Sequence, residues 1–192
     1  MSQTEAALIK NGSVTADDLA STLDLSGKTI TLPSGVGGKV LQVVSTTKTD
    51  TTSQPHSPNV WYDISGMSLS ITPTSTSNKV LVLFRMSIGT DSGGEGIIRL
   101  IRNSTAIGLA DSASNRTLAF DGTGRNAVVW SPLPVSGQHL DSPSSTSAVT
   151  YKFQWASPFA TATMYLNRSF NDGDSADRYR TSSSITLMEV AG

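Results

Sequence analysis

Alternation of apolar and polar residues is clearest in the last quarter of the chain, residues 147–190. The segment 147–155 places its large apolar side chains at every second position: Val149, Tyr151, Phe153 and Trp155. The segments 161–167 and 183–190 follow the same period of two, which is typical of strands with one buried face. A sheet that is dry on one face needs a second sheet to cover it. The pattern therefore predicts a β-sandwich.

The earlier part of the chain contains further predicted strands. They lie at 39–44, 61–71, 79–88, 97–102, 105–110 and 126–131. The most apolar is 79–88, which we expect at the centre of a sheet and covered on both faces at its start. Gly66 is expected to mark a β-bulge within 61–71.

Three polar stretches separate these strands. We expect loops at 45–58 and at the proline-rich 132–147, and a long polar segment at 111–124 with a turn at Asp121-Gly122. About eight to ten strands at fairly regular spacing predict an all-β fold, a jelly-roll-like antiparallel β-sandwich.

Residues 1–38 differ from the rest of the chain. Thr15 is placed as a helix N-cap with Asp18 three residues later, and Val14 and Leu19 can form a hydrophobic staple. The predicted helix extends to about Leu23. A helix of this length is too short to be stable alone in water. The glycine-rich 33–38 is a flexible joint. We therefore divide the chain into an extended arm with a short helix, 1–38, and a β-sandwich knob domain, 39–192.

The arm has too few apolar residues for a core of its own, yet more than a linker needs. A disordered leader is one interpretation. The favoured one is an anchoring arm that becomes ordered on a partner or on neighbouring copies. The apolar residues expected to dock are Leu8, Ile9, Val14, Leu19 and Leu23.

The composition narrows the possible partners. The net charge is -1, charged residues make up 15% of the chain, and there are 30 Ser and 23 Thr. Such a surface lacks the basic stripe that nucleic-acid binding requires. There is no cysteine, and no apolar run is long enough to cross a membrane. The N-terminus does not resemble a signal peptide, so we expect folding in the cytoplasm and no membrane insertion.

Few residues suggest catalysis. The two histidines, His56 and His139, both lie in expected Pro/Ser loops, and no serine lies in a G-x-S-x-G motif. No pair of carboxylates is set up for acid–base chemistry. We therefore expect no enzyme activity, no catalytic residues and no cofactor.

The segment 171–177 gathers three carboxylates in seven residues. Oxygen-rich loops can bind calcium, but the spacing misses the EF-hand pattern and no bidentate Glu follows. A solvated hairpin loop is the favoured interpretation over a metal site, so no metal is predicted.

Loop residues able to stack on sugars and to hydrogen-bond them are the remaining candidates for function. The predicted receptor contacts are Asp172, Asp174, Arg178, Tyr179 and Arg180. Trp61 and Tyr62 have suitable side chains, but a place in the core or in an interface is the favoured interpretation for both.

Several segments resemble virion proteins of tailed bacteriophages, particularly those of marine hosts. They are 38–44 (GKVLQVV), 70–82 (SITPTSTSNKVLV), 140–152 (LDSPSSTSAVTYK), 166–169 (LNRS) and 183–190 (SSITLMEV). The arm segment 12–20 (GSVTADDLA) resembles connector segments near the N-termini of phage fibre proteins.

This resemblance implies a tail-fibre-like structural protein located in the virion. By analogy we expect a homotrimer, attached through residues 1–32 to other virion proteins of the tail, collar or capsid. Its distal loops would contact a host-surface polysaccharide or protein. Because the chain has no extended shaft, a capsid decoration or head-fibre protein is the alternative.

Overall fold

A computed structural model of the chain describes residues 39–91, 95–125, 130–158 and 160–192. These residues belong to a compact unit that spans Gly38–Gly192. Outside them lie the helix predicted after Thr15 and the predicted docking residues, Leu8, Ile9, Val14, Leu19 and Leu23. Within the described ranges there is no helix long and apolar enough to cross a membrane.

The regular secondary structure of the described ranges is β-strand. In chain order the strands are β1 (Val40–Lys48), β2 (Thr52–His56), β3 (Tyr62–Ile71), β4 (Lys79–Thr90), β5 (Glu95–Arg102), β6 (Thr105–Ile107), β7 (Asp121–Arg125), β8 (Leu133–Asp141), β9 (Val149–Ala156), β10 (Ala162–Leu166) and β11 (Ser183–Val190). The period-two pattern is confirmed in β9 and β11, where buried and half-buried residues alternate.

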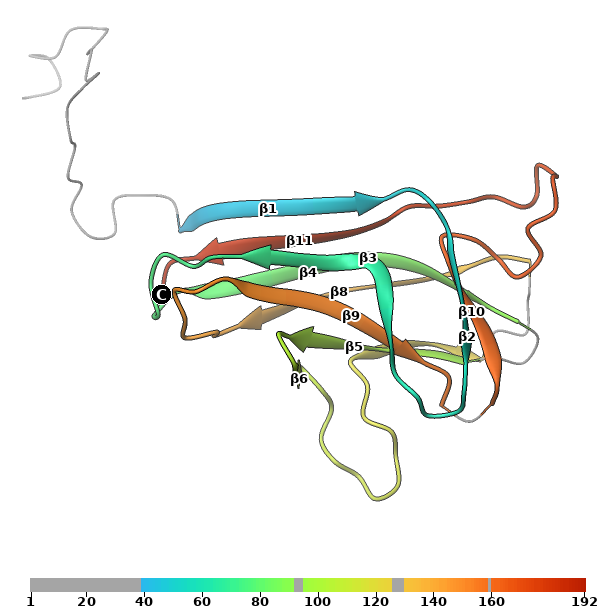
Figure 1. The fold of residues 1–192 in the computed structure, drawn as a ribbon, viewed down its shortest axis with the longest axis horizontal. Coiled ribbons are helices and arrows are strands. Elements are labelled where there is room, and N and C mark those ends of the chain that lie inside the picture. Colours follow the sequence, from blue (N-terminus) through green and yellow to red (C-terminus); the bar gives the residue numbers. More distant parts are fainter. Residues whose placement is uncertain (1–38, 92–94, 126–129, 159) are drawn as a thin grey trace, which may run out of the picture. The chain divides into compact units, whose positions relative to one another are not determined.

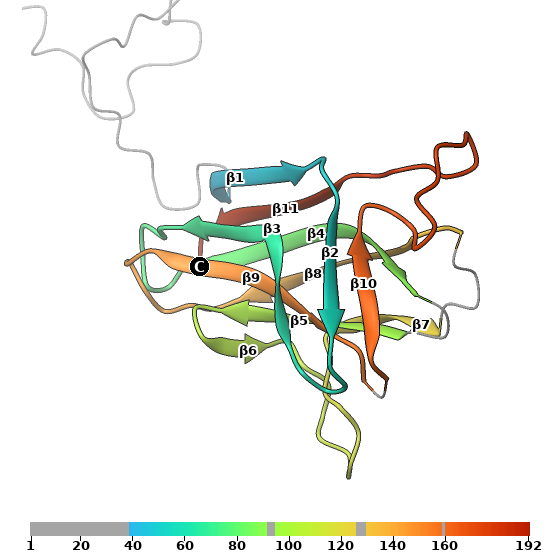
Figure 2. The same cartoon turned by 45° about the vertical axis from the view of Figure 1, so that its right-hand side comes forward.

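The strands form two antiparallel sheets (Figures 1 and 2). One sheet has the order β1-β11-β4-β10-β2, with β8 also paired to β4. The other has the order β3-β9-β5-β6, with β7 also paired to β5. The predicted all-β fold of two antiparallel sheets is confirmed, and a jelly-roll order of the strands stays a prediction.

Strand β4 lies at the centre of its sheet, as predicted, between β8 on one side and β11 followed by β10 on the other. Its burial alternates over the first half and becomes continuous over 86–90. The prediction that its start is covered on both faces is therefore wrong, because its end is the covered part. At Gly89 an added Cβ would lie 2.5 Å from the carbonyl oxygen of Arg168, so the chain after β10 covers the second face there.

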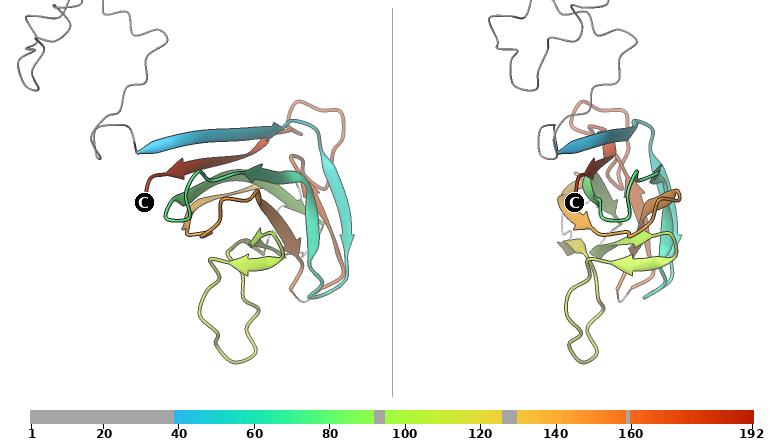
Figure 3. Two further views of the ribbon diagram at one scale, coloured as in Figure 1. Left: turned by 60° about the vertical axis from the view of Figure 1, so that its left-hand side comes forward. Right: turned by 90° about the vertical axis from the view of Figure 1, so that its left-hand side faces the viewer.

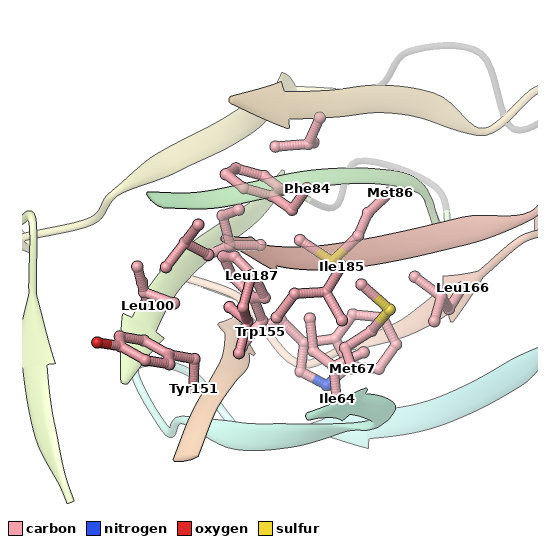
Figure 4. Close-up of a cluster of buried hydrophobic side chains, with 14 of the residues drawn as sticks. Ile64, Met67, Phe84, Met86, Leu100, Tyr151, Trp155, Leu166, Ile185 and Leu187 are labelled. Carbon is pink, nitrogen blue, oxygen red and sulfur yellow. The ribbon is translucent and has the colours of Figure 1, made fainter. Parts of the chain in front are cut away.

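The core lies between the two sheets and is built from the inward side chains of both (Figure 4). Its largest fully buried side chains include Trp155, Tyr151 and Phe153 of β9, together with Met67 and Met86. Burying side chains of this size contributes about 1.5–3 kcal/mol each. The aromatic residues that predicted β9 from sequence therefore form the centre of the core.

Three predictions about the loops are wrong. The expected loop 45–58 contains β2, the expected loop 132–147 contains β8, and the expected turn at Asp121-Gly122 belongs to β7. Pro55 and Pro134 suggested loops, but β2 and β8 each pair with a strand on one side only. An edge strand tolerates proline because one side of its backbone needs no N–H donor. Of the strand expected at 126–131, residues 126–129 lie outside the described ranges, and Trp130 and Ser131 are not in a strand.

Two buried carboxylates join parts of the sandwich. Asp141 of β8 accepts hydrogen bonds from Arg102 of β5 (2.8 and 3.0 Å) and from the Tyr151 hydroxyl of β9 (2.6 Å), which connects the two sheets. Glu189 of β11 is buried, and its Oε1 accepts from the Thr74 N–H (2.6 Å) and the Asn78 side-chain amide (2.6 Å). Burial raises the pKa of Glu189, but the hydrogen bonds from Thr74 and Asn78 outweigh it, so the net pKa is below the usual value. Glu189 thereby fixes the turn between β3 and β4 to the end of β11.

Candidate functional site

The two ends of the sandwich carry different features. In the pairing of β1 with β11, Val40 lies opposite Val190 and Lys48 lies opposite Ser183. Lys39 and the C-terminal residue Gly192 are therefore at one end, where the Ala191 N–H donates to the Lys39 carbonyl oxygen (2.8 Å). The loop 167–182, between β10 and β11, is at the other end (Figures 1 and 3). Eight paired residues at about 3.4 Å each separate the two ends by about 25 Å.

Asn167 holds the base of the loop 167–182. Its side chain is fully buried and its backbone φ is +65°, which an asparagine tolerates better than most residues. The side-chain amide donates to the carbonyl oxygens of Lys48 (2.9 Å) and Asp50 (2.8 Å), and its oxygen accepts from the Ser183 hydroxyl (2.6 Å). Sequence alternation predicted Asn167 on a solvent-facing side, which is wrong because the residue closes the loop from within.

Ion pairs organise the loop above this base. Asp172 accepts hydrogen bonds from Arg180 (3.1 and 2.6 Å) and lies 3.0 Å from Arg168 Nη1. The hydrogen bond from Arg180 lowers the pKa of Asp172, burial opposes this, and Arg168 lowers it further, so the net pKa of this carboxyl is below its usual value. Asp177 likewise contacts Arg178 and Ser175. The loop contains three arginines and three aspartates, so its formal charges cancel.

The loop encloses a polar hollow of about 330 Å³. It is lined by Asp172, Gly173, Asp174, Ser175, Arg178 and Arg180. Four of the five residues predicted from sequence as receptor contacts therefore share one hollow. The fifth, Tyr179, lies between two of the lining residues in sequence and is 51% exposed.

Exposed aromatic side chains belong to the same end. Trp130 and Phe170 are each 45% exposed, and the Arg178 guanidinium lies 4.0 Å from the centre of the Trp130 ring. Phe170 packs against Tyr165 with ring centres 6.0 Å apart. Tryptophan, tyrosine and arginine are the side chains most enriched where proteins bind partners. Sequence reasoning missed Trp130 because it precedes β8, far from the loop along the chain, and only the fold brings it to Arg178.

A second, larger hollow lies on the outer face of the five-stranded sheet. It has a volume of about 600 Å³ and is lined by Asp63, Ile64, Ser65, Gly66, Ser68, Asn103, Ser104, Thr150 and Lys152. The predicted bulge at Gly66 is confirmed by a shift in the pairing with β9 and by a φ of +80°. Beside the hollow, Arg99 stacks on Trp61 (4.4 Å) and donates to Gln154 (2.8 Å). Trp61 and Tyr62 are half-buried, with Tyr62 packed against the core.

The histidines are not loop residues, which corrects the sequence prediction. His56 ends β2, is 1% exposed, and packs edge-on against Tyr62 and Trp155 at ring-centre distances of 4.6 and 5.4 Å. His139 lies within β8 and packs edge-on against Phe120. In the described ranges, no group of three or more His, Cys, Asp or Glu side chains is close enough to hold a metal ion. The exposed aromatic and charged side chains described above lie together at the 167–182 end.

No protein-family model matches the chain. No curated protein matches it either. Among solved structures, that of infectious bursal disease virus strain Gx is similar with a TM-score of 0.39 at 12% identity, over 85% of this chain and 41% of that chain. The VP2 subviral particle of the same virus is similar with a TM-score of 0.35 at 14% identity, over 91% of this chain and 46% of that chain. The chain thus spans less than half the length of these viral chains, and we argue its function from its own residues.

Proposed function

We propose that this chain is a structural protein of a tailed-bacteriophage virion. The sandwich is a fibre-like knob, and residues 1–32 attach it to tail, collar or capsid proteins. The loop 167–182 contacts the host surface. Support comes from the resemblance of several segments to phage virion proteins and from the geometry of the described residues.

The observation that carries the proposal is that the two opposite ends of the sandwich carry different features. The chain enters at Lys39, at the end where Val40 pairs with Val190. The exposed aromatic residues Trp130, Phe170 and Tyr179 gather with the charged hollow around the opposite end. A protein held at the first end presents the second to whatever lies beyond the particle. Loops on a rigid scaffold are also where binding residues concentrate.

The chemistry of the loop indicates the class of ligand. The formal charges of its three arginines and three aspartates cancel, and two of the aspartates are held in ion pairs, so the loop as a whole attracts neither strong anions nor strong cations. Aromatic faces and hydrogen-bonding groups remain. These features suit an uncharged polysaccharide of the host surface, or a protein surface without a strong net charge.

The location of the protein on the particle tests this function first. In electron micrographs of intact particles, antibody against the chain is expected to label the tail or its fibres. A chain lacking residues 1–32 is expected to be absent from particles although it folds. Label spread over the head would instead support a capsid decoration protein, and the loop 167–182 would then lose its role in host contact.

Replacing Tyr179 by alanine is expected to slow adsorption of particles to host cells by about tenfold, the effect of losing a well-placed aromatic contact. Adsorption rates of wild-type and variant particles measure this. The matched control is Leu140→Ala, because Leu140 is equally exposed at 51% but lies on β8, away from the loop. Equal adsorption of all three kinds of particle would contradict a role for Tyr179 in host contact.

A further inference from the structure

The edges of the two sheets differ in how they are protected against pairing with other strands. Unprotected edges recruit further strands, and proteins block them with prolines, bulges, charges or short strands. Five edge strands carry such a feature. Pro55 lies in β2 and Pro134 in β8, β3 is bulged at Gly66, β6 has three residues, and β7 contains an aspartate and two glycines. Five of the edges in the described ranges are therefore poor templates for the pairing of a further strand.

Strand β1 is the exception. It pairs only with β11 among the described strands, and its sequence, VLQVVSTTK, contains no proline and a single charge. Its bulge is confined to the first residues, between Val40 and Gln42, so pairing is regular from there to Lys48. The Lys48 side chain is only 9% exposed: it bonds Asp50 (2.7 Å) and packs over Gly66. The one lysine within β1 is therefore held by Asp50 and Gly66 and does not protect this edge.

Apolar side chains continue from this edge across the outer face of the sheet. Val43 lies opposite Met188 of β11, Met188 opposite Leu81 of β4, and Leu81 opposite Leu140 of β8. The row begins with Val43, 53% exposed, and Val40 and Leu41 beside it are about half exposed. Exposed apolar patches of this kind mark interaction surfaces. Here the patch and the open edge coincide on β1, which lies at the edge of its sheet (Figure 2).

We infer that β1 pairs with β1 of a second copy of the chain, antiparallel and about a two-fold axis, which gives a dimer in place of the homotrimer expected by analogy. Residues 42–47 carry no charge, so a charged partner strand would bury its own charges without counter-charges. A second β1 brings the same uncharged, β-branched, unprotected edge. Two-fold contacts of identical surfaces are the commonest in homo-oligomers.

The charges of the outer face favour edge-to-edge pairing over stacking of two faces. Lys79 and Arg85 lie on β4, opposite Val190 and Ser184 of β11. Stacking two such faces brings these cations together, whereas pairing through β1 keeps them apart by several strands. The two sheets then continue as one, with the apolar patches of both copies side by side.

The test is the mass of the full chain in solution, followed by sedimentation or light scattering over a range of concentrations. A dimer that dissociates on dilution is expected. Val43→Lys is expected to weaken the association about tenfold or more, because a lysine on an edge strand opposes its pairing with further strands. Leu140→Lys is the matched control, since Leu140 has nearly the same exposure in the same row but lies on β8. It should leave the dimer unchanged.

A mixing experiment identifies the partner strand. Val43→Lys and Val43→Glu, each weakened in association alone, are expected to associate more tightly when mixed, because repulsion between like charges on the paired strands is then replaced by attraction. The backbone N–H groups of 42–47 that point away from β11 should exchange their hydrogens more slowly as the protein concentration rises. A monomer at every concentration would overturn the inference. A trimer would also overturn it, because a single two-fold contact cannot build a trimer. The same holds for a dimer whose association is weakened as much by Leu140→Lys as by Val43→Lys.

Discussion

Replacing Asp141 by alanine is expected to destabilise the sandwich by about 3–5 kcal/mol, the cost of removing one partner of a buried charged network. Asp141 is 7% exposed and holds Arg102 and Tyr151 of the opposite sheet. Without it, the buried Tyr151 hydroxyl loses its acceptor and the Arg102 guanidinium loses its carboxylate. Urea unfolding at neutral pH measures the change in the free energy of unfolding.

A surface ion pair of similar length provides the control. Asp63 accepts from Lys152 (2.7 Å), but its side chain is mostly exposed. Asp63→Ala is expected to cost no more than about 1 kcal/mol, because water already solvates both groups. Asp141→Asn should fall between the two variants, since it keeps an oxygen acceptor and loses the charge. Equal stabilities of Asp141→Ala and Asp63→Ala would show that Asp141 does not join the sheets energetically.

The free energy of unfolding of the wild-type chain is expected to fall as pH drops from about 6.5 to 4, by up to about 3 kcal/mol. Burial lowers the pKa of His56 to about 4, and an interaction with the Val60 backbone opposes this only in part. Neither ring nitrogen makes a hydrogen bond of ordinary geometry to the described residues. The folded state therefore keeps His56 neutral in a pH range where the unfolded chain binds a proton.

The sign of the effect follows from this difference. At pH values above about 6.5, His56 is neutral in both the folded and the unfolded state, and the free energy of unfolding has its full value. As pH falls, only the unfolded state gains the proton, so stability is lost until the folded pKa is reached. Thermal or urea unfolding between pH 7.5 and about 4.5 measures this loss. Carboxylates with lowered pKa, such as Glu189 and Asp172, lose most of their contribution below this range, as pH falls from their unfolded toward their folded pKa.

His56→Leu is expected to remove the pH dependence, because leucine fills a similar volume without titrating. At pH 7.5 its stability should be close to the wild type. Lost ring contacts with Tyr62 and Trp155, each about 0.5–1.5 kcal/mol, are offset by removing buried nitrogens without partners. Near pH 4.5 the variant should be the more stable protein. His139→Leu is the control and should keep the slope; a slope that persists in His56→Leu would assign the effect to other groups.

Local alternation was sufficient to predict β9, the strand at the centre of the core. Val149, Tyr151, Phe153 and Trp155 all point inward, because a period of two places every second side chain on one face whatever the partner strand is. The same argument located β11 to the residue, and the high apolar content of 79–88 placed β4 at the centre of a sheet. The receptor candidates of 172–180 also came from sequence, since charged and aromatic residues between two apolar strands indicate an exposed loop.

Tertiary structure decided what local pattern could not encode. Pro55 and Pro134 predict loops as long as the neighbours are unknown; as members of edge strands they need no N–H on one side, so both segments are strands. Trp130 joins Arg178, and Asp141 joins Tyr151, because the topology makes distant segments adjacent. His56 becomes a buried, pH-sensitive group only because Tyr62 and Trp155 enclose it. Sequence alone determined which faces of β9 and β11 are dry, because the side-chain period is local. Sheet edges, the burial of single polar groups and the composition of the site depend on which strands meet.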